Sequence, residues 1–352
     1  MARISTVGLD LAKNVFQVHG IDDEGTVIMA KALRRAQVST VFGKLEPCLI
    51  GMEACGGAHY WARELMKFGH TVKLMPPAYV STYVKRGKTD KGDAKAICEA
   101  VRSKTMTFVA IKPAGQQSLS MLHSVRQTLI GQRTQAINAL RGHLSELGVI
   151  APQGIVGQGE LAAVVRDAGD ARLPAIARLA LTVLVQQIES TSGAIAELDR
   201  VLMAEHKADD LSCRLQAIPS IGPVIASALR ARITDPKLFK NGRHMAAWIG
   251  IVPENDSSGG KPRQKGISKM GDRYLRQLMV GGAMSVVRQA QRKPDKYPWL
   301  TKLLARLHPK AAAVALANKT ARIAWAIMAR GGIYQPGHRA TKYLTAELAA
   351  AA

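Results

Sequence analysis

The chain has 352 residues, of which 47% are hydrophobic, enough to bury the cores of two or three domains. It carries 49 Lys and Arg against 26 Asp and Glu, a formal net charge of +23 at pH 7. Such an excess favours a polyanionic partner, usually a nucleic acid, because each neutralised phosphate releases a counterion. A basic enzyme that binds no nucleic acid is the alternative.

Targeting signals and metal-binding cysteine patterns are missing from the sequence. The N-terminal segment lacks the apolar core of a signal peptide, and the most apolar late segment contains Lys319 and Arg322. The four cysteines form no C-x-x-C pair, which is typical of reduced thiols. We therefore expect a cytoplasmic protein.

Residues 3 to 112 alternate between short β-rich runs and helical runs. The pattern predicts strands at 4–10, 15–21, 26–32, 47–53 and 70–75, with helices at 36–46, at 56–69 and from about 89. A three-strand meander followed by β-α-β-α units indicates a mixed α/β sheet. We expect the first domain to span residues 1–112.

Residues 113 to 208 have a helical period. Apolar residues recur every three or four positions from Leu119 to Leu147 and from Leu181 to Leu202, on either side of a segment, 151–160, with one proline and three glycines. This predicts two long helices joined by a glycine-rich turn. They could form an antiparallel coiled coil shared with another subunit, or a plain hairpin within one chain.

Residues 209 to 352 are expected to form a third, mostly helical and basic domain that ends in a tail. Between Lys237 and Arg330 there are nineteen Lys and Arg against four Asp and Glu, so this is the expected nucleic-acid face. Residues 215–233 predict a helix, a Pro/Gly turn and a second helix. The turn amides could hold a phosphate, as in helix-hairpin-helix modules, or the segment could be structural only.

Four acids occupy positions typical of a metal site. Asp10 ends the first predicted strand and Glu53 ends the fourth, while Asp90 and Asp93 lie three apart on one helix. Residues at this spacing share a helix face, with β-carbons about 5–6 Å apart. Carboxylates brought together raise one another's pKa, and hard divalent cations with oxygen ligands relieve the repulsion.

Each acid of the helix also has a simpler interpretation. Asp90 could be a first-turn acid favoured by the helix dipole, and Asp93 could pair with a nearby lysine. Acids placed directly after apolar strands, as Asp10 and Glu53 are, argue for the metal site. The neighbouring cations, which would then contact phosphates beside the metal, are Lys88, Lys91 and Lys95.

Three motifs, "GLDLAKNVFQVHGID", "MEACGGAHYW" and "KTDKGDAKAI", resemble the DEDD insertion-sequence transposases, relatives of the Piv invertase. The resemblance implies a RuvC-type, ribonuclease-H-like fold for the first domain. It also implies that the catalytic acids and metal ligands are Asp10, Glu53, Asp90 and Asp93. Two Mg²⁺ per active site would clamp the attacking and leaving oxygens of a phosphodiester.

A serine-containing segment lies in the basic region. Residues 256–265 are polar and cationic, which predicts a mobile loop; no base lies near Ser257 or Ser258, and His244 is the nearest histidine. By chemistry alone either serine is a solvated loop residue.

The order of proline, S-G, a basic stretch, S-K-x-G and L-R resembles the C-terminal domain of the same transposases. The resemblance implies that Ser258, matched through Ser258-Gly259, is a nucleophile that bonds covalently to DNA, with the adjacent Ser257 as the alternative. The nearby cations expected to bind nucleic acid are Lys261, Arg263, Lys265, Lys269, Arg273 and Arg276.

These observations predict an insertion-sequence recombinase that cuts and rejoins DNA through a phosphoserine intermediate. No ATP-binding G-x-x-x-x-G-K-[ST] motif occurs, as expected when covalent linkage conserves the phosphodiester energy. The resemblance implies guidance by a noncoding bridge RNA. Recombination of two duplexes needs several active sites, which favours dimers that assemble into a tetramer, in a nucleoid-associated bacterial protein. Aromatic residues, at 5%, are too few for an extensive base-stacking platform.

Two other functions remain open. One is a RuvC-like, metal-dependent junction nuclease that uses water as its nucleophile. The other is a nucleic-acid-binding protein with a decayed site. A covalent protein–DNA adduct would exclude the nuclease, and loss of activity on changing Asp90 would exclude the decayed site.

Overall fold

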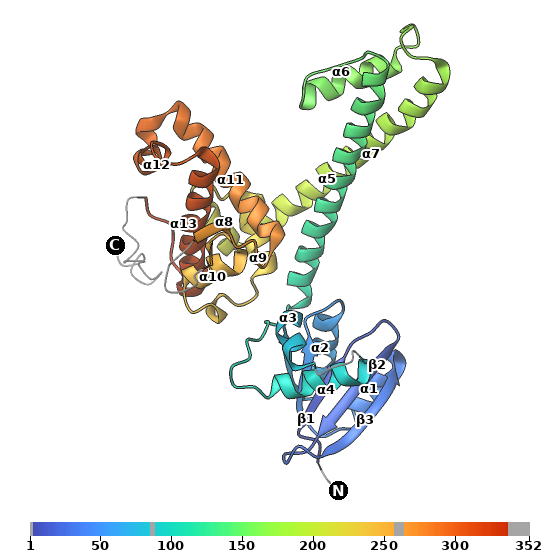
Figure 1. Ribbon diagram of the computed structural model, residues 1–352, viewed down its shortest axis with the longest axis vertical. Coiled ribbons are helices and arrows are strands. Elements are labelled where there is room, and N and C mark those ends of the chain that lie inside the picture. Colours follow the sequence, from blue (N-terminus) through green and yellow to red (C-terminus); the bar gives the residue numbers. More distant parts are fainter. Residues whose placement is uncertain (1–2, 85–88, 257–263, 337–352) are drawn as a thin grey trace. The chain divides into compact units, whose positions relative to one another are not determined.

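The computed structural model describes residues 3–84, 89–256 and 264–336. The chain divides into two compact units, Met1–Gln117 and Ser118–Ala352 (Figure 1). Among the described helices, none combines the length and the hydropathy that crossing a membrane requires.

The first unit is built on a five-stranded mixed sheet, as predicted. Its strands, in chain order, are β1 (Thr6–Asp10), β2 (Val15–Ile21), β3 (Val27–Arg34), β4 (Leu49–Glu53) and β5 (Thr71–Met75). The spatial order is β3-β2-β1-β4-β5. The first three strands form an antiparallel meander, while β4 pairs parallel to β1 and β5 pairs parallel to β4.

Helices cover both faces of this sheet. Helices α1 (Val38–Phe42) and α2 (Ala58–Met66) pack on the face that carries the buried strand residues Val7, Leu9, Ile50 and Met52. The short helix α3 (Pro77–Val80) and the longer α4 (Asp90–Val101) share a smaller core on the other side. Helix α1 is shorter than predicted, since it ends at Gly43.

The second unit begins with long helices. They are α5 (Ala114–Glu146), whose residues up to Gln117 belong to the first unit, α6 (Ile155–Arg166) and α7 (Ala175–Ala208), and buried side chains of all three form one apolar core. The expected glycine-rich turn is partly wrong, because α6 starts inside it. A Cβ on Gly157 would lie 1.8 Å from the Pro152 carbonyl oxygen, so this glycine permits a close approach and does not break the helix.

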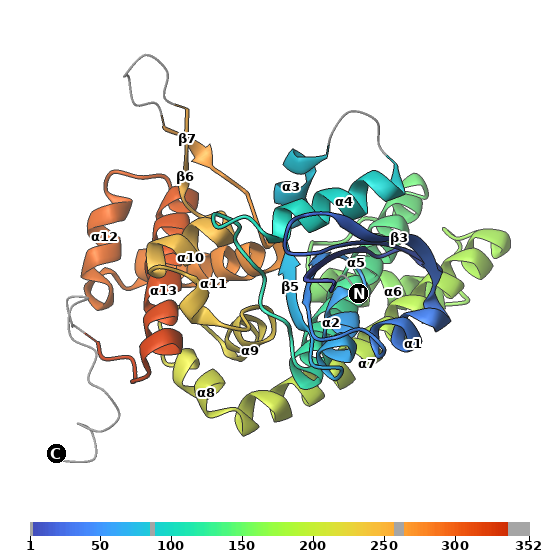
Figure 2. The ribbon, with the colours of Figure 1, turned by 90° about the horizontal axis from the view of Figure 1, so that it is seen from below.

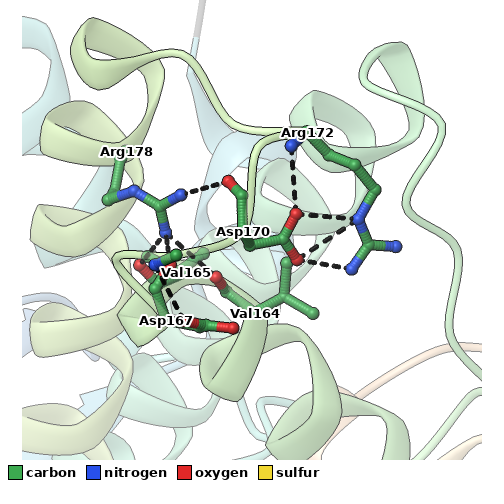
Figure 3. Close-up of polar contacts among 7 residues, drawn as sticks. Val164, Val165, Asp167, Asp170, Arg172 and Arg178 are labelled. Carbon is green, nitrogen blue, oxygen red and sulfur yellow. Dashed lines mark hydrogen bonds and ion pairs between the residues drawn. The ribbon is translucent and has the colours of Figure 1, made fainter.

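Arginine side chains close the connection from α6 to α7 (Figure 3). The Arg178 guanidinium donates to backbone carbonyl oxygens at and beyond the end of α6, those of Val164, Val165, Asp167 and Asp170. The carbonyls of Val164 and Val165 are among those that a helix end leaves without an internal partner. Hydrogen bonds from Arg172 lower the pKa of the Asp170 carboxyl to about 2.

The rest of the second unit is mostly helical, as predicted, with one β-hairpin (Figure 2). Its elements are α8 (Asp210–Gln216), α9 (Pro223–Arg232), α10 (Gly242–Ile249), β6 (Pro253–Asn255), β7 (Gln264–Ile267), α11 (Arg273–Arg292), α12 (Pro298–Leu304) and α13 (Pro309–Arg330). The predicted helix-turn-helix is α8 and α9. Its turn packs on α11, where a Cβ on Gly282 would lie 2.3 Å from the Ser220 carbonyl oxygen.

Candidate active site

Asp10 and Glu53 end two neighbouring parallel strands. The register of β1 and β4 pairs Thr6 with Leu49 and Gly8 with Gly51, so two further residues along each strand lead to Asp10 and Glu53. Successive side chains in a strand point to opposite faces. Both acids therefore belong to the sheet face of Gly8 and Gly51, the face that α4 crosses.

Two glycines allow α4 to contact the sheet backbone. A Cβ on Gly8 would lie 2.1 Å from the Ala94 carbonyl oxygen and 2.5 Å from the Cys98 amide nitrogen. A Cβ on Gly51 would lie 2.7 Å from the Val101 Cβ. The pair sets the height of α4 above the two strands that carry the acids.

The direction of α4 brings its first turn toward Asp10. Ala94 contacts Gly8, while the Cys98 thiol lies 3.9 Å from the Thr6 carbonyl oxygen. Four helical residues rise about 6 Å and two strand residues span about 6.6 Å, so α4 runs opposite to β1 along this stretch. One turn before Ala94, Asp90 lies toward the carboxyl end of β1.

Helix α4 begins at Asp90 because Thr89 caps it, accepting a hydrogen bond from the Gly92 amide at 3.1 Å. Asp90 is exposed, whereas Asp93 is half-buried, as are Asp10 and Glu53. Asp90 and Asp93 thus occupy the first helical turn, as predicted from their spacing.

The thiol of Cys55 lies near both strand acids. Burial raises its pKa, and the charges of Glu53 and Asp10 raise it further. Within the described part of the chain, no group of three or more His, Cys, Asp or Glu is close enough to hold a metal ion. The fold brings the strand acids to one edge and directs the first turn of α4 there, but it does not gather all four carboxylates around one point.

The carboxylate donors nevertheless suit a hard divalent cation by their chemistry. Glu53 and Asp10 are half-buried oxygen donors at the end of a sheet, without a competing cysteine–histidine set at zinc-ligand spacing. The residues present therefore fit Mg²⁺ better than a soft metal.

The expected nucleophile, Ser258, lies outside the described residues, as do Ser257, Lys88, Lys261 and Arg263. The flanking strands β6 and β7 pair antiparallel, and Lys265 Nζ lies 2.5 Å from an Asp256 carboxylate oxygen. His244, the nearest histidine in sequence, accepts a hydrogen bond from the Lys240 amide at 3.3 Å.

The other residues predicted to contact nucleic acid differ in their exposure and in the contacts they already make. Lys91, Lys269 and Arg273 are exposed. Lys95 is also exposed and lies 4.0 Å from Glu99. Arg276 donates to the carbonyl oxygens of Ile249 and Met270, both at 2.8 Å, which gives this side chain a structural role.

A buried polar cluster in the second unit was not predicted. His123 of α5 is fully buried, with its ring nitrogens 2.9 Å from the Tyr274 hydroxyl and 3.0 Å from the Ser227 hydroxyl. Burial and then the charges of Arg232 and Arg126 lower the pKa of His123 to about 4, so the imidazole is neutral at pH 7. The cluster joins α5 to α9 and to the start of α11.

Two family models match the chain. Residues 7–149 match a DEDD transposase domain of IS110 elements, described as "Transposase", and residues 212–298 match the model described as "Transposase IS116/IS110/IS902 family". The first match contains all four acids, and the second contains the β6–β7 hairpin.

Full-length relatives carry matching names. A Pseudomonas aeruginosa protein named "Probable family 20 transposase" is 46% identical over 95% of this chain and 99% of its own length. The "Transposase for insertion sequence element IS1111A" of Coxiella burnetii is 38% identical over 96% of this chain and 93% of its own length. That for element IS1328 of Yersinia enterocolitica is 36% identical over 95% and 99%.

These matches run from the strand acids through the C-terminal helices. A transposase is an enzyme that acts on DNA, and a DEDD domain suggests dependence on a divalent metal. The chain belongs to the IS116/IS110/IS902 family of insertion-sequence transposases.

Proposed function

We propose that this transposase cuts and rejoins DNA through a covalent bond between Ser258 and a DNA phosphate, with two Mg²⁺ held by Asp10, Glu53, Asp90 and Asp93. The observation that carries the proposal is the placement of Asp10 and Glu53 at adjacent strand ends, on the sheet face crossed by α4. The sheet order β3-β2-β1-β4-β5 is consistent with a RuvC-like domain.

The chemistry divides between the acids and the serine. When bound, the cations supply charge stabilisation to the phosphate oxygens. The Ser258 oxygen forms a bond to phosphorus while a P–O bond of the DNA strand breaks, and the freed strand end takes a proton. We assign acceptance of the serine proton to the acidic set, since a hydroxyl is a weak nucleophile until a base removes its proton. Attack by the second strand's hydroxyl then releases the serine.

Trapping of the covalent intermediate tests this proposal. Full-length protein, incubated with donor DNA and Mg²⁺ and quenched in denaturant, is expected to yield a protein–DNA adduct. Ser258→Ala is expected to yield none, because the bonding oxygen is gone, while the matched variant Ser257→Ala retains the adduct. Cleaved DNA without an adduct in wild type would indicate water as the nucleophile, and an adduct lost only in Ser257→Ala would move the role to Ser257.

We further propose three domains, at 1–112, 113–208 and 209–352, and a dimer that assembles into a tetramer on DNA. A serine and metal ligands in separate domains must meet at one phosphate. Helices α5 and α7, of 33 and 34 residues, could supply the reach between the acids of one protomer and Ser258 of another. Recombination of two duplexes needs several active sites, which supports an oligomer.

We propose that a noncoding guide RNA encoded by the element selects the donor and target DNA. We also propose that the protein is cytoplasmic and associated with the nucleoid. The net charge of +23 supports a polyanionic partner, whether DNA or RNA. Protein purified from cells that carry the flanking element DNA is expected to retain one enriched RNA species from that element. Sequencing of the bound RNA checks this, and a preparation active in strand exchange without any such RNA would remove the guide.

A further inference from the structure

The last helices of the second unit carry cations that have no acidic partner among the described residues. Residues 288–330 contain ten Lys and Arg and one acid, Asp295, and all ten cations are exposed. Within the described ranges, none of the ten lies within salt-bridge distance of a carboxylate. In the long-helix region, by contrast, Arg126 pairs with Asp199 at 2.5 Å and Arg166 pairs with Glu189. The C-terminal cations are thus available to an external anion.

An exposed tryptophan lies among these cations. Trp299 of α12 is 43% exposed, and Lys319 of α13 places its ammonium 4.2 Å from the indole centroid. Lys302 follows Trp299 at three positions, the spacing of one helix face, and Arg306 lies just beyond the end of α12 at Leu304; both are exposed. We call these four residues, together with Lys296 on the preceding turn, the α12 platform.

We propose that the α12 platform binds an unpaired DNA strand, with one base stacked on Trp299 and the flanking phosphates held by its cations. An indole face accepts any base because every base has a π-face, but bases within a duplex are already stacked on one another. The ammonium of Lys319 lies over one face of the indole, so a base would stack on the other face, with this positive charge close to its flanking phosphates. An apolar protein partner would leave the four cations of the platform without counter-charge.

The platform has no feature that selects RNA. A 2′-hydroxyl both donates and accepts hydrogen bonds; the charged side chains of the platform can donate to its oxygen as they would to a phosphate, but they offer no acceptor for its hydrogen. Strand exchange unpairs DNA, so the inference deepens the proposed function and rests on it for the identity of the strand. The binding test below needs no catalysis and can be carried out on Ser258→Ala. Failure of strand binding by the platform can therefore be distinguished from failure of the proposed Ser258 chemistry.

Tryptophan fluorescence reports stacking directly. The chain has four tryptophans; Trp61 and Trp325 are buried and Trp248 is partly buried, which leaves Trp299 as the exposed emitter. A 20-nucleotide dT oligomer is expected to quench the emission of Ser258→Ala protein, and the quenching is expected to disappear in Trp299→Phe. Quenching that is unchanged in Trp299→Phe would overturn the proposal.

Binding affinities for single-stranded and duplex DNA distinguish base stacking on Trp299 from general electrostatic attraction. Trp299→Ala is expected to weaken binding of a labelled dT oligomer by roughly 5-fold to 100-fold, and Trp299→Phe by less. Affinity for a duplex of the same length is expected to change by less than about 2-fold. Lys302→Ala is expected to lower the salt dependence of dT binding, and Lys237→Ala, an exposed lysine outside the platform, serves as the matched control.

Three results would contradict the platform. Equal losses of duplex and dT affinity in Trp299→Ala would indicate general charge attraction or a folding defect. Binding of rU oligomers without binding of dT would assign the surface to RNA. A change in oligomeric state of Trp299→Ala, measured by light scattering, would assign it to contact between copies of the chain.

Discussion

Asp93→Asn is expected to reduce strand exchange on the order of 10³-fold or more, because a neutral amide cannot balance the charge of a divalent cation. Folding is expected to persist, since Asn keeps the size of the side chain and only a first-turn charge worth about 0.3–1 kcal/mol is lost. Glu99→Gln is the matched control: it removes another carboxylate of α4, one that lies 4.0 Å from Lys95, and should retain activity. The measurement is recombination of donor and target DNA in vitro.

Mixing two inactive variants distinguishes loss of the Asp93 carboxylate as a metal ligand from damage to the fold. If the acids of one protomer act with Ser258 of another, Asp93→Asn mixed with Ser258→Ala forms dimers that have one intact composite site. Part of the activity should then return, although each variant alone is inactive. Equal activity of Asp93→Asn and wild type would remove Asp93 from the site.

Gly8→Ala is expected to destabilise the first unit by about 3 kcal/mol or more, the upper range for overpacking. The added methyl would meet backbone atoms of α4 at 2.1 and 2.5 Å, and backbone cannot move aside as a flexible side chain can. Urea unfolding followed through Trp61, the tryptophan of the first unit, measures the effect.

Two other glycines of the same unit serve as comparisons for the loss of stability expected in Gly8→Ala. Gly51→Ala should be milder, because the nearest atom belongs to the Val101 side chain at 2.7 Å. Gly56→Ala should be nearly neutral, since nothing lies within 4 Å of its added Cβ. Wild-type stability in Gly8→Ala would mean that α4 does not contact β1 as described.

The sequence predicted much of the first unit because its signals are local. Alternating apolar residues identified all five strands, and the position of Thr89 before Asp90 is a helix-start signal. Placement of Asp10 and Glu53 at strand ends followed from the same patterns. The resemblance to DEDD transposases was confirmed by the family models and the relatives.

Features that depend on distant contacts could not be predicted. Tyr274 and His123 are 151 positions apart, so neither local pattern indicates the cluster, although a histidine on the apolar face of a long helix is a weak signal. The start of α6 was missed because glycine reads as a helix breaker, whereas Gly157 serves close packing on Pro152. A low aromatic content argued against extensive stacking but could not place Trp299 against Lys319.

The central claim is that the four acids and Ser258 act on one phosphate with a divalent cation. The most direct test compares the yield of the covalent protein–DNA adduct with and without the metal. Wild-type protein with donor DNA is expected to form the adduct in Mg²⁺ and to lose it in excess EDTA, and Asp10→Asn is expected to form none in either condition. An adduct of undiminished yield in EDTA, or in Asp10→Asn, would contradict the account.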